Sequence, residues 1–185
     1  MSETALPGWD EDRRPRSRVR GGPAAAARGQ GRHLVEIHDH YRSSLAQVRL
    51  VLERVAGQDL DVGTARAAVH AVGLRATYEQ LGSFCAQACA MVEVHHTFED
   101  VRMYPALRDA EPALDAVLER LTEEHHVVHA VLVALDEELV GLVEEPGRLD
   151  RVRLLFAHLE TLLLSHFRYE EDELCGPLGR QPLLF

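Results

Sequence analysis

Apolar residues recur at intervals of three and four along most of this chain, which is the spacing of amphipathic helices. The pattern predicts four long helices over about residues 33–56, 75–109, 111–143 and 150–173, and a short helix over about 64–72. No segment alternates with the period of two that a strand requires. Glycine and proline mark the expected ends of the helices, at Gly57, Gly73, Pro112, Pro146-Gly147 and Gly176-Pro177.

Long helices joined by short loops favour one architecture. We predict an all-α fold, an antiparallel up-and-down four-helix bundle with a short extra helix between the first and second long helices. The chain of 185 residues lies within the usual range for one domain. A chain of this length buries enough apolar surface to fold without disulfides.

Residues 1–32 have a different composition. They hold seven Arg against four acidic residues, a net charge of +3, whereas the remainder of the chain carries −13. They are rich in Pro, Gly and Ala and show no sustained amphipathic period. We therefore predict a disordered basic tail over 1–32, dispensable for the chemistry of a folded domain over 33–185.

Charge, cysteine content and hydropathy narrow the class of protein. A net charge of −10 argues against a general nucleic-acid binder. Three cysteines without a secretory signal fit a reducing cytosol, and no apolar run is long enough for a membrane span, so a cytoplasmic protein is expected. Cys85 and Cys89 lie in a small, apolar run. Packing as small hydrophobic residues is the preferred interpretation over a redox or metal pair, because their spacing is not CxxC.

Histidines and carboxylates cluster once in each predicted long helix. The i, i+4 spacing places two side chains on one face, as in His95/Glu99 and His125/His129. On the first helix, His38 shares an apolar stripe with its neighbours and His40 does not, so His38 is expected to point inward. His96, His126 and His158 are expected at the surface or in support of other residues.

The fourth helix leaves two choices beside His166. Glu170 follows His166 at i+4 and therefore lies on the same face. Glu171, at i+5, lies roughly 140° around the helix and reaches the same site only if it approaches from another side.

One such pair arises easily by chance on a surface helix, but four in consecutive helices do not. If five histidines and two carboxylates were buried in a bundle core without a cation, their charges and polar atoms would lack partners, and this burial would cost free energy. Imidazole and carboxylate ligands from four helices can enclose two transition-metal ions, and this ligand chemistry suits iron. The sequence therefore predicts a metal site in the core.

The order of these residues resembles the hemerythrin-like HHE cation-binding family over about residues 33–178. Met103-Tyr104-Pro105-Ala106-Leu107 and Tyr169-Glu170-Glu171 are similar to the family too, whereas Tyr104 itself and Cys175-Gly176-Pro177 depart from its usual pattern. The resemblance implies a non-haem di-iron centre, oxo- or hydroxo-bridged, and it favours Glu171 over Glu170 as a bridging carboxylate. The metal ligands that it implies are His38, His95, Glu99, His125, His129, His166 and Glu171.

The resemblance and the histidine-rich ligand set imply reversible binding of O2 or NO by a carrier, sensor or store. A di-iron oxidoreductase acting on peroxide or on a small substrate with O2 is the alternative, and iron storage or handling is a second one. No catalytic side chain is assigned; Tyr41, Tyr104 and Tyr169 are expected to pack in the core rather than to donate electrons or protons. The expected partners are a diatomic gas or peroxide and an unknown reductase, with neither nucleic acid nor membrane.

Overall fold

The structure is a computed structural model that describes residues 6–19, 29–59, 81–82, 85, 87–142 and 144–181. These residues form helices, turns and extended segments but no strand, so the prediction of an all-α protein is confirmed. The short helix predicted over 64–72 lies outside the described residues.

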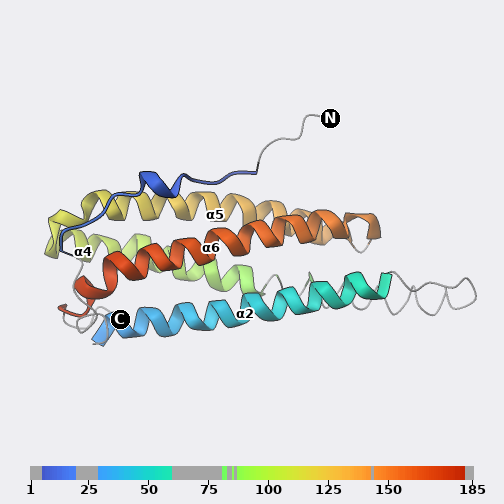
Figure 1. The fold of residues 1–185 in the computed structure, drawn as a ribbon, viewed down its shortest axis with the longest axis horizontal. Helices are drawn as coiled ribbons and strands as arrows, with labels where there is room; N and C mark the ends of the chain where they lie inside the picture. Colours follow the sequence, from blue (N-terminus) through green and yellow to red (C-terminus); the bar gives the residue numbers. More distant parts are fainter. Residues whose placement is uncertain are drawn as a thin grey trace, which may run out of the picture.

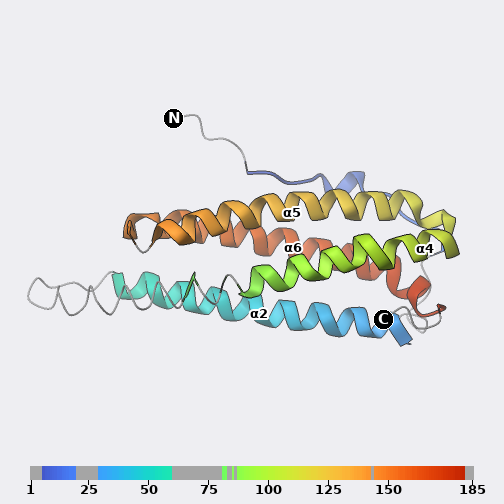
Figure 2. The same cartoon turned by 180° about the vertical axis from the view of Figure 1, so that it is seen from behind.

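Three helices form most of the bundle: α2 (Gly29–Asp59), α5 (Asp115–Leu142) and α6 (Leu149–Leu178). Helical residues 87–98 continue through a π-helical turn, η2 (Glu99–Met103), into α4 (Tyr104–Ala110), and we call residues 87–110 the second helix. Three short 3-10 turns complete the described elements: η1 (Glu11–Arg13), η3 (Pro112–Leu114) and η4 (Pro146–Arg148). Figures 1 and 2 show these helices side by side as a bundle, and α6 packs against both α2 and α5.

Two helix ends differ from the prediction. Helix α2 begins at Gly29 rather than near residue 33, and α6 continues past Gly176 and Pro177 to Leu178. Proline is tolerated near the end of α6 because its missing N–H removes a single backbone hydrogen bond there. Leu174, Cys175 and Leu178 are buried, and their packing stabilises the last turn against that loss.

The π-helical turn is the other difference from a regular helix. The Tyr104 N–H donates to the Glu99 carbonyl five residues earlier, one residue further than in an α-helix. The extra residue changes which side chains face the core: Glu99, Met103 and Tyr104 are all buried, and Asp100 between them is half-buried. Such turns occur often at functional sites, and their presence does not show in hydrophobic periodicity.

The apolar core is divided into two clusters, and a polar layer lies between them. In each long helix, the buried residues of the first apolar cluster and of the second apolar cluster lie on opposite sides of a buried histidine along the sequence, with Phe167 as the exception. The first cluster includes Tyr41, Val92, Val128 and Leu163; the second includes Leu34, Met103, Leu121 and Tyr169. Because the histidines His38, His95, His125 and His166 occupy the intervening positions, packing of the two clusters brings all four helices' histidines to one level.

The predicted disordered tail of residues 1–32 includes a segment that the structure places against the bundle. Residues 6–19 run along α5 and α6 as an ordered segment, seen in dark blue in Figure 1. Arg14 in this segment has a side chain only 5% exposed, paired with Glu124 of α5. The composition of residues 1–32 predicts that Arg14 is solvated. Its partner Glu124 lies so far along the sequence that local patterns do not reveal the pair.

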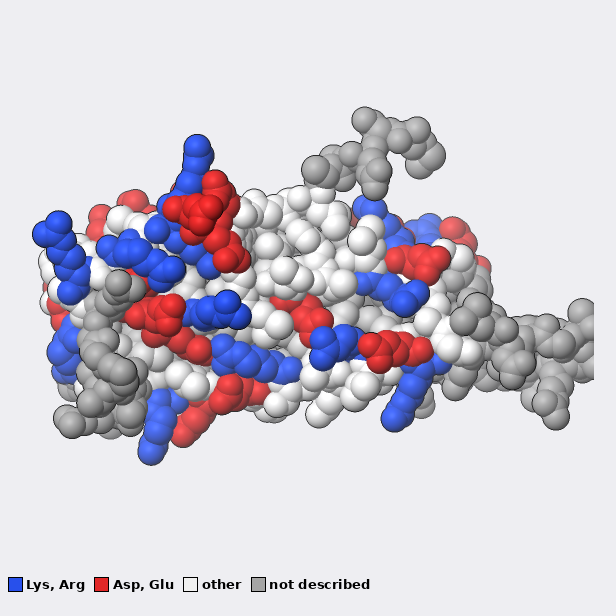
Figure 3. Space-filling model, viewed as in Figure 1, with Lys and Arg blue, Asp and Glu red and all other residues white. Residues whose placement is uncertain are grey.

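The molecular surface mixes charges of both signs. Figure 3 shows Arg beside Asp and Glu over much of the visible face. The surface ion pairs include Arg49–Glu160 and Arg153–Asp150. Among the described helices, none combines the length and hydropathy needed to span a bilayer.

Candidate metal centre

Seven buried side chains from four helices form the polar layer. Helix α2 supplies His38, α5 supplies His125, and α6 supplies His166 and Glu170; the second helix supplies the other three. The exposed fractions are 0% for His38, His166 and Glu170, 1% for Glu99, 3% for His125, 6% for His96 and 8% for His95. Histidine and glutamate are rarely buried to this degree without partners, so the layer requires a physical explanation.

The first group of donor atoms comes from His38, His95, Glu99 and Glu170, which each place one ligand atom within 4.8 Å of the others. The Nε2 atoms of His38 and His95 are 3.2 Å apart. His38 Nε2 lies 3.3 Å from Glu170 Oε2, and His95 Nε2 lies 3.1 Å from Glu99 Oε1. Two nitrogens and two carboxylates therefore surround one point.

The second group comes from His96, His125 and His166. The Nε2 atoms of His125 and His166 are 3.2 Å apart, and the His96 ring stacks on His125 with centroids 3.9 Å apart. The carboxylates of the first group also reach this one: Glu99 Oε2 is 3.5 Å from His125 Nε2, and Glu170 Oε2 is 3.8 Å from His166 Nε2. Glu99 and Glu170 thus lie between the two groups of histidines.

The donor set fits metal cations. Within the described chain, no hydrogen bond reaches four buried atoms of the layer: His96 Nε2, both carboxylate oxygens of Glu99, and Glu170 Oε2. These atoms lie close to other ligand atoms of the layer but form no hydrogen bonds with them. Their lone pairs therefore point toward common centres rather than toward one another. Two nitrogens bound about 2.1 Å from one ion at right angles lie about 3.0 Å apart, close to the observed His–His separations. A cation at each group would satisfy donor atoms that are otherwise buried at a cost.

Burial sets the protonation of most histidines in the layer. It lowers the pKa of His95 to about 3, and it also lowers the pKa of His96 and of His166. These imidazoles are neutral at pH 7, which is the form that binds metal. At His38 burial opposes the charged form, but the adjacent carboxylates of Glu170 and Glu171 outweigh it and raise the pKa of this histidine.

The two central carboxyl groups differ in charge. Burial raises the pKa of Glu99 well above its usual range, and the nearby charge of Glu170 adds to that effect. Burial acts on Glu170 too, but the adjacent positive charge of His38 outweighs it and lowers the pKa of Glu170. Without a cation, one of these two carboxyl groups is charged and the other is neutral, whereas a bound cation would stabilise both as anions.

Three further carboxylates orient the histidines from behind. The Nδ1 atoms of His38, His125 and His166 lie 2.8, 3.0 and 3.1 Å from oxygens of Glu171, Asp100 and Glu124, respectively. In addition, the Tyr104 hydroxyl donates to Glu170 Oε1 at 2.9 Å. A carboxylate at Nδ1 fixes the ring and its tautomer so that Nε2 presents a lone pair, an arrangement typical of metal-binding histidines.

The structure brings five of the seven sequence-predicted ligands together: His38, His95, Glu99, His125 and His166. His40 is exposed, as the apolar stripe of α2 indicated. His129 is also exposed, so the structure does not bring this predicted ligand into the layer. The reason is that His125 lies at the edge of the buried face of α5, and a residue four positions later is rotated roughly 40° further outward.

Glu171 is the other predicted ligand that the structure does not bring into the layer. Its side chain is 20% exposed and lies behind His38, whereas Glu170 is fully buried between the two groups. The i, i+4 spacing from His166 predicts that Glu170 faces the layer, whereas the family resemblance favours Glu171. The residue that sequence reasoning missed is His96; the available signal was its position three residues before Glu99 on a helix whose buried face includes Val92.

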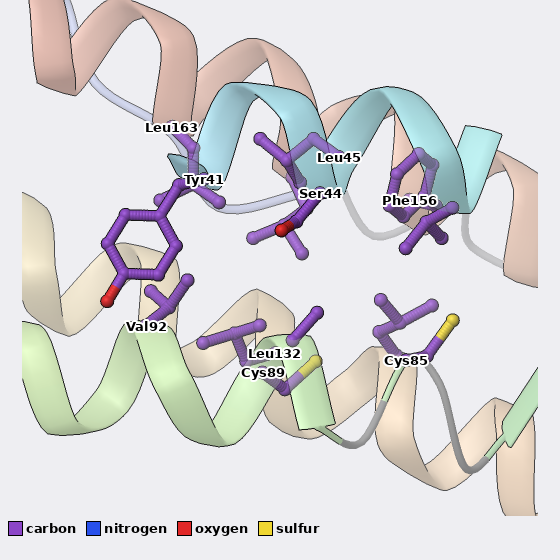
Figure 4. A pocket seen from close by; sticks show the side chains of 13 residues that line it. Tyr41, Ser44, Leu45, Cys85, Cys89, Val92, Leu132, Phe156 and Leu163 are labelled. Atoms are coloured by element: carbon purple, nitrogen blue, oxygen red, sulfur yellow. The ribbon is translucent and has the colours of Figure 1, made fainter. Parts of the chain in front are cut away.

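An apolar cavity of about 20 Å³ lies in the first apolar cluster beside the polar layer. Tyr41 connects the two, since it lines the cavity and its ring lies 5.1 Å from that of His95. Cys85 and Cys89 form part of the wall (Figure 4) and are free thiols. Burial raises their pKa values to about 12 and about 11, so they pack as small apolar residues, as the sequence favoured.

A larger groove of about 550 Å³ reaches the layer from outside. It lies between α2 and the second helix, and His95 and Glu99 are among the residues that line it. Most of the remaining lining is apolar or aromatic, including the exposed Met91 and Val94 and the partly buried Phe98. The groove has the size of a small-molecule site and provides a route to the first group of ligand atoms.

Comparison with known proteins supports the same interpretation. A search of curated proteins and a search of solved structures each found no match. The family model of the hemerythrin HHE cation-binding domain matches residues 30–176, which include all seven side chains of the layer. The chain therefore belongs to the hemerythrin HHE cation-binding domain family.

Proposed function

We propose that this protein holds two iron ions in a non-haem di-iron centre and binds O2 or NO reversibly, as a carrier, sensor or store. The observation that carries the proposal is the buried layer of five histidines and two glutamates, four of whose donor atoms receive no hydrogen bond in the described structure. One ion would be held by His38 and His95 and the other by His96, His125 and His166, with Glu99 and Glu170 shared. The proposal includes an up-and-down antiparallel bundle, which the alternating order of the two apolar clusters along the helices supports.

The side chains around the layer suit reversible gas binding. Iron would supply an open position for a diatomic ligand. Phe167 stacks on His38 with ring centroids 4.2 Å apart, and Tyr41 packs against His95, so bulk water is kept from that side. The Tyr104 hydroxyl donates to Glu170 and so holds that carboxylate in place. A histidine-rich, water-poor site favours binding over oxygen activation.

The test is anaerobic loading with Fe(II), followed by optical spectra on adding O2 and then on removing it. We expect about two irons per chain and a visible absorption band that appears with O2 and disappears on its removal. A chain that takes up no iron would overturn the metal centre. A chain that takes up iron without responding to O2 or NO would leave storage or handling as the function.

The groove between α2 and the second helix specifically favours a second candidate, an oxidoreductase acting on peroxide or on a small apolar substrate with O2. A carrier of diatomic gas has no need of a 550 Å³ opening that reaches two ligand residues. Continuous oxidation of a small aromatic reductant, slowed by Val94→Trp at the exposed wall of the groove, would support the enzyme. Stoichiometric, reversible gas binding that is unchanged by Val94→Trp would support the carrier.

A further inference from the structure

The N-terminal segment, residues 6–19, lies outside the matched family domain and yet contacts the elements that hold the metal centre. The carbonyl of Pro7 lies 2.6 Å from His158 Nε2, and the carbonyl of Pro15 accepts from the Tyr169 hydroxyl at 2.8 Å. The Ser17 N–H donates to Glu173 at 2.8 Å. These contacts fix the segment along α6 on both sides of Arg14.

Arg14 is the buried centre of the segment. Its Nε and Nη2 atoms donate to the two oxygens of Glu124 at 2.7 and 2.8 Å, in a bidentate pair. The exposed fractions of the two side chains are 5% and 0%. The guanidinium also lies 4.7 Å from the ring centroid of Tyr169 and 5.5 Å from that of Trp9. A guanidinium held on all of these sides has little freedom to move.

Glu124 transmits this contact to the layer. The same Oε2 atom that accepts from Arg14 lies 3.1 Å from His166 Nδ1, and the opposite nitrogen of His166 belongs to the second group of ligand atoms. A chain of charged hydrogen bonds therefore runs from Arg14 through Glu124 to His166.

The equivalent contacts at the other two histidines come from the bundle itself. Asp100, behind His125, accepts from Thr122 at 3.0 Å. Glu171, behind His38, accepts from Arg42 at 2.8 Å. Besides His166, Glu124 contacts Arg120 of the bundle at 3.1 Å, but among the described residues only Arg14 binds both of its oxygens.

We propose that Arg14 is a positioning residue for the metal centre: through Glu124 it orients His166, and it thereby sets the affinity of the His96/His125/His166 position separately from that of the other. The inference rests on the proposed metal centre and adds a regulatory element from outside the family domain. Because the N-terminal segment carries Arg14, its detachment would weaken one of two neighbouring metal positions.

The asymmetry follows from the contacts. Without Arg14, Arg120 is the arginine that remains against the buried Glu124, so we expect this carboxylate to turn toward Arg120 and His166 to lose a fixed acceptor. Loss of a group that orients a metal-binding histidine costs about 10–100-fold in metal affinity. The His38/His95 position keeps its own support, because Glu171 is held by Arg42.

The test is anaerobic titration of the full-length protein with Co(II) alone, followed by its visible spectrum. Arg14→Gln should weaken one of two equivalents by about 10–100-fold and leave the other unchanged. Arg16→Gln is the matched control: Arg16 lies on the same segment, is half-exposed and pairs with Glu173 and Asp172 rather than Glu124. It should leave both equivalents unchanged. Arg42→Gln should weaken the other equivalent.

A second measurement separates positioning from general stability. In the Co(II)-loaded protein, the exchangeable Nδ1 protons of His38, His125 and His166 should give three shifted NMR signals. Arg14→Gln should move one signal and speed its exchange with solvent, while the other two serve as internal references. If the variant folds poorly, Arg14→Lys keeps the charge without the bidentate geometry and should give an intermediate affinity.

Two results would overturn the inference. The first is an Arg14→Gln protein that binds both equivalents as tightly as the original with three unmoved signals. The second is an equal weakening of both equivalents together with lower thermal stability of the metal-free protein, which would mark Arg14 as merely structural. Neither result bears on the proposed function, which fails if the unmodified protein binds no metal or takes up iron without responding to O2 or NO.

Discussion

At the scale of single residues, the side chains that matter most are those whose donor atoms remain without hydrogen bonds after folding. His96 is the clearest case, because its Nε2 atom is buried and receives no hydrogen bond in the described structure. The i, i+4 spacing and the apolar stripes predict five of the seven layer residues, because they report which face of a helix is buried. They do not predict His96, because spacing alone does not show which of two adjacent histidines faces the core.

The first prediction contrasts His96 with His129. His96→Ala should reduce bound iron from about two ions per chain to about one, because it removes one of three nitrogens from the second group. His129→Ala, at an exposed position, should leave two. Metal analysis after anaerobic loading measures both. Loss of iron from His129→Ala alone would mean that α5 is rotated relative to the present structure.

The second prediction concerns the adjacent carboxylates of α6. Glu170→Gln should release at least one iron and abolish magnetic coupling in the oxidised pair, because Glu170 lies between the two groups. Glu171→Gln should keep the coupling and weaken binding by about 10–100-fold, because this residue only supports His38. Magnetic susceptibility and iron content decide between them. The opposite pattern would restore the family-based assignment of Glu171.

The third prediction tests the two thiols of the apolar cavity. Burial holds the pKa of Cys85 at about 12 and that of Cys89 at about 11, so neither forms appreciable thiolate at pH 8. Because the thiolate is the nucleophile, iodoacetamide should label neither residue in the folded protein and both in urea. Mass spectrometry of the labelled peptides gives the result. Rapid labelling of the folded chain would revive the redox interpretation of this pair.

At the scale of elements, periodicity predicted where helices run but not how they deviate. The π-helical turn of Glu99–Met103 depends on a single extra residue per turn, to which an apolar pattern is insensitive. The sequence predicts that α6 ends before Pro177, yet burial of Leu174 and Leu178 outweighs one missing hydrogen bond, and the helix continues. The contacts of the N-terminal segment are equally hard to predict, because its partners lie in α5 and α6, far along the sequence.

The fourth prediction follows from that segment. Deleting residues 1–19 leaves Glu124 buried without its bidentate partner, and removal of one member of a buried ion pair typically costs about 3 kcal/mol or more. Urea unfolding of the metal-free protein should show a loss near the lower end of that range, since Arg120 still contacts Glu124. A truncated chain with unchanged unfolding free energy would show that the segment contributes nothing to stability, as the composition alone suggested.

At the scale of the whole molecule, the polar layer divides one hydrophobic core into two. Each apolar cluster packs residues from all four long helices, so the clusters alone can assemble the bundle. The layer between them contributes little to folding without a cation, because its carboxyl groups and imidazoles are buried with several donor atoms left without hydrogen bonds. The metal-free protein should therefore fold, with its weakest region at this level.

The last prediction measures how far bound metal compensates for that layer. A ligand that binds only the folded state at 100 times its dissociation constant adds about 2.7 kcal/mol. For a domain of this size, each kcal/mol shifts Tm by about 2–4 °C, so loading with Fe(II) should raise Tm by about 5–10 °C. Calorimetry under anaerobic conditions tests this, with a Glu99→Gln/Glu170→Gln double variant as the control that should show almost no shift. Equal Tm values for the loaded and metal-free protein would mean that the layer binds iron too weakly to couple to folding, since any tight site made by four helices must stabilise their assembly.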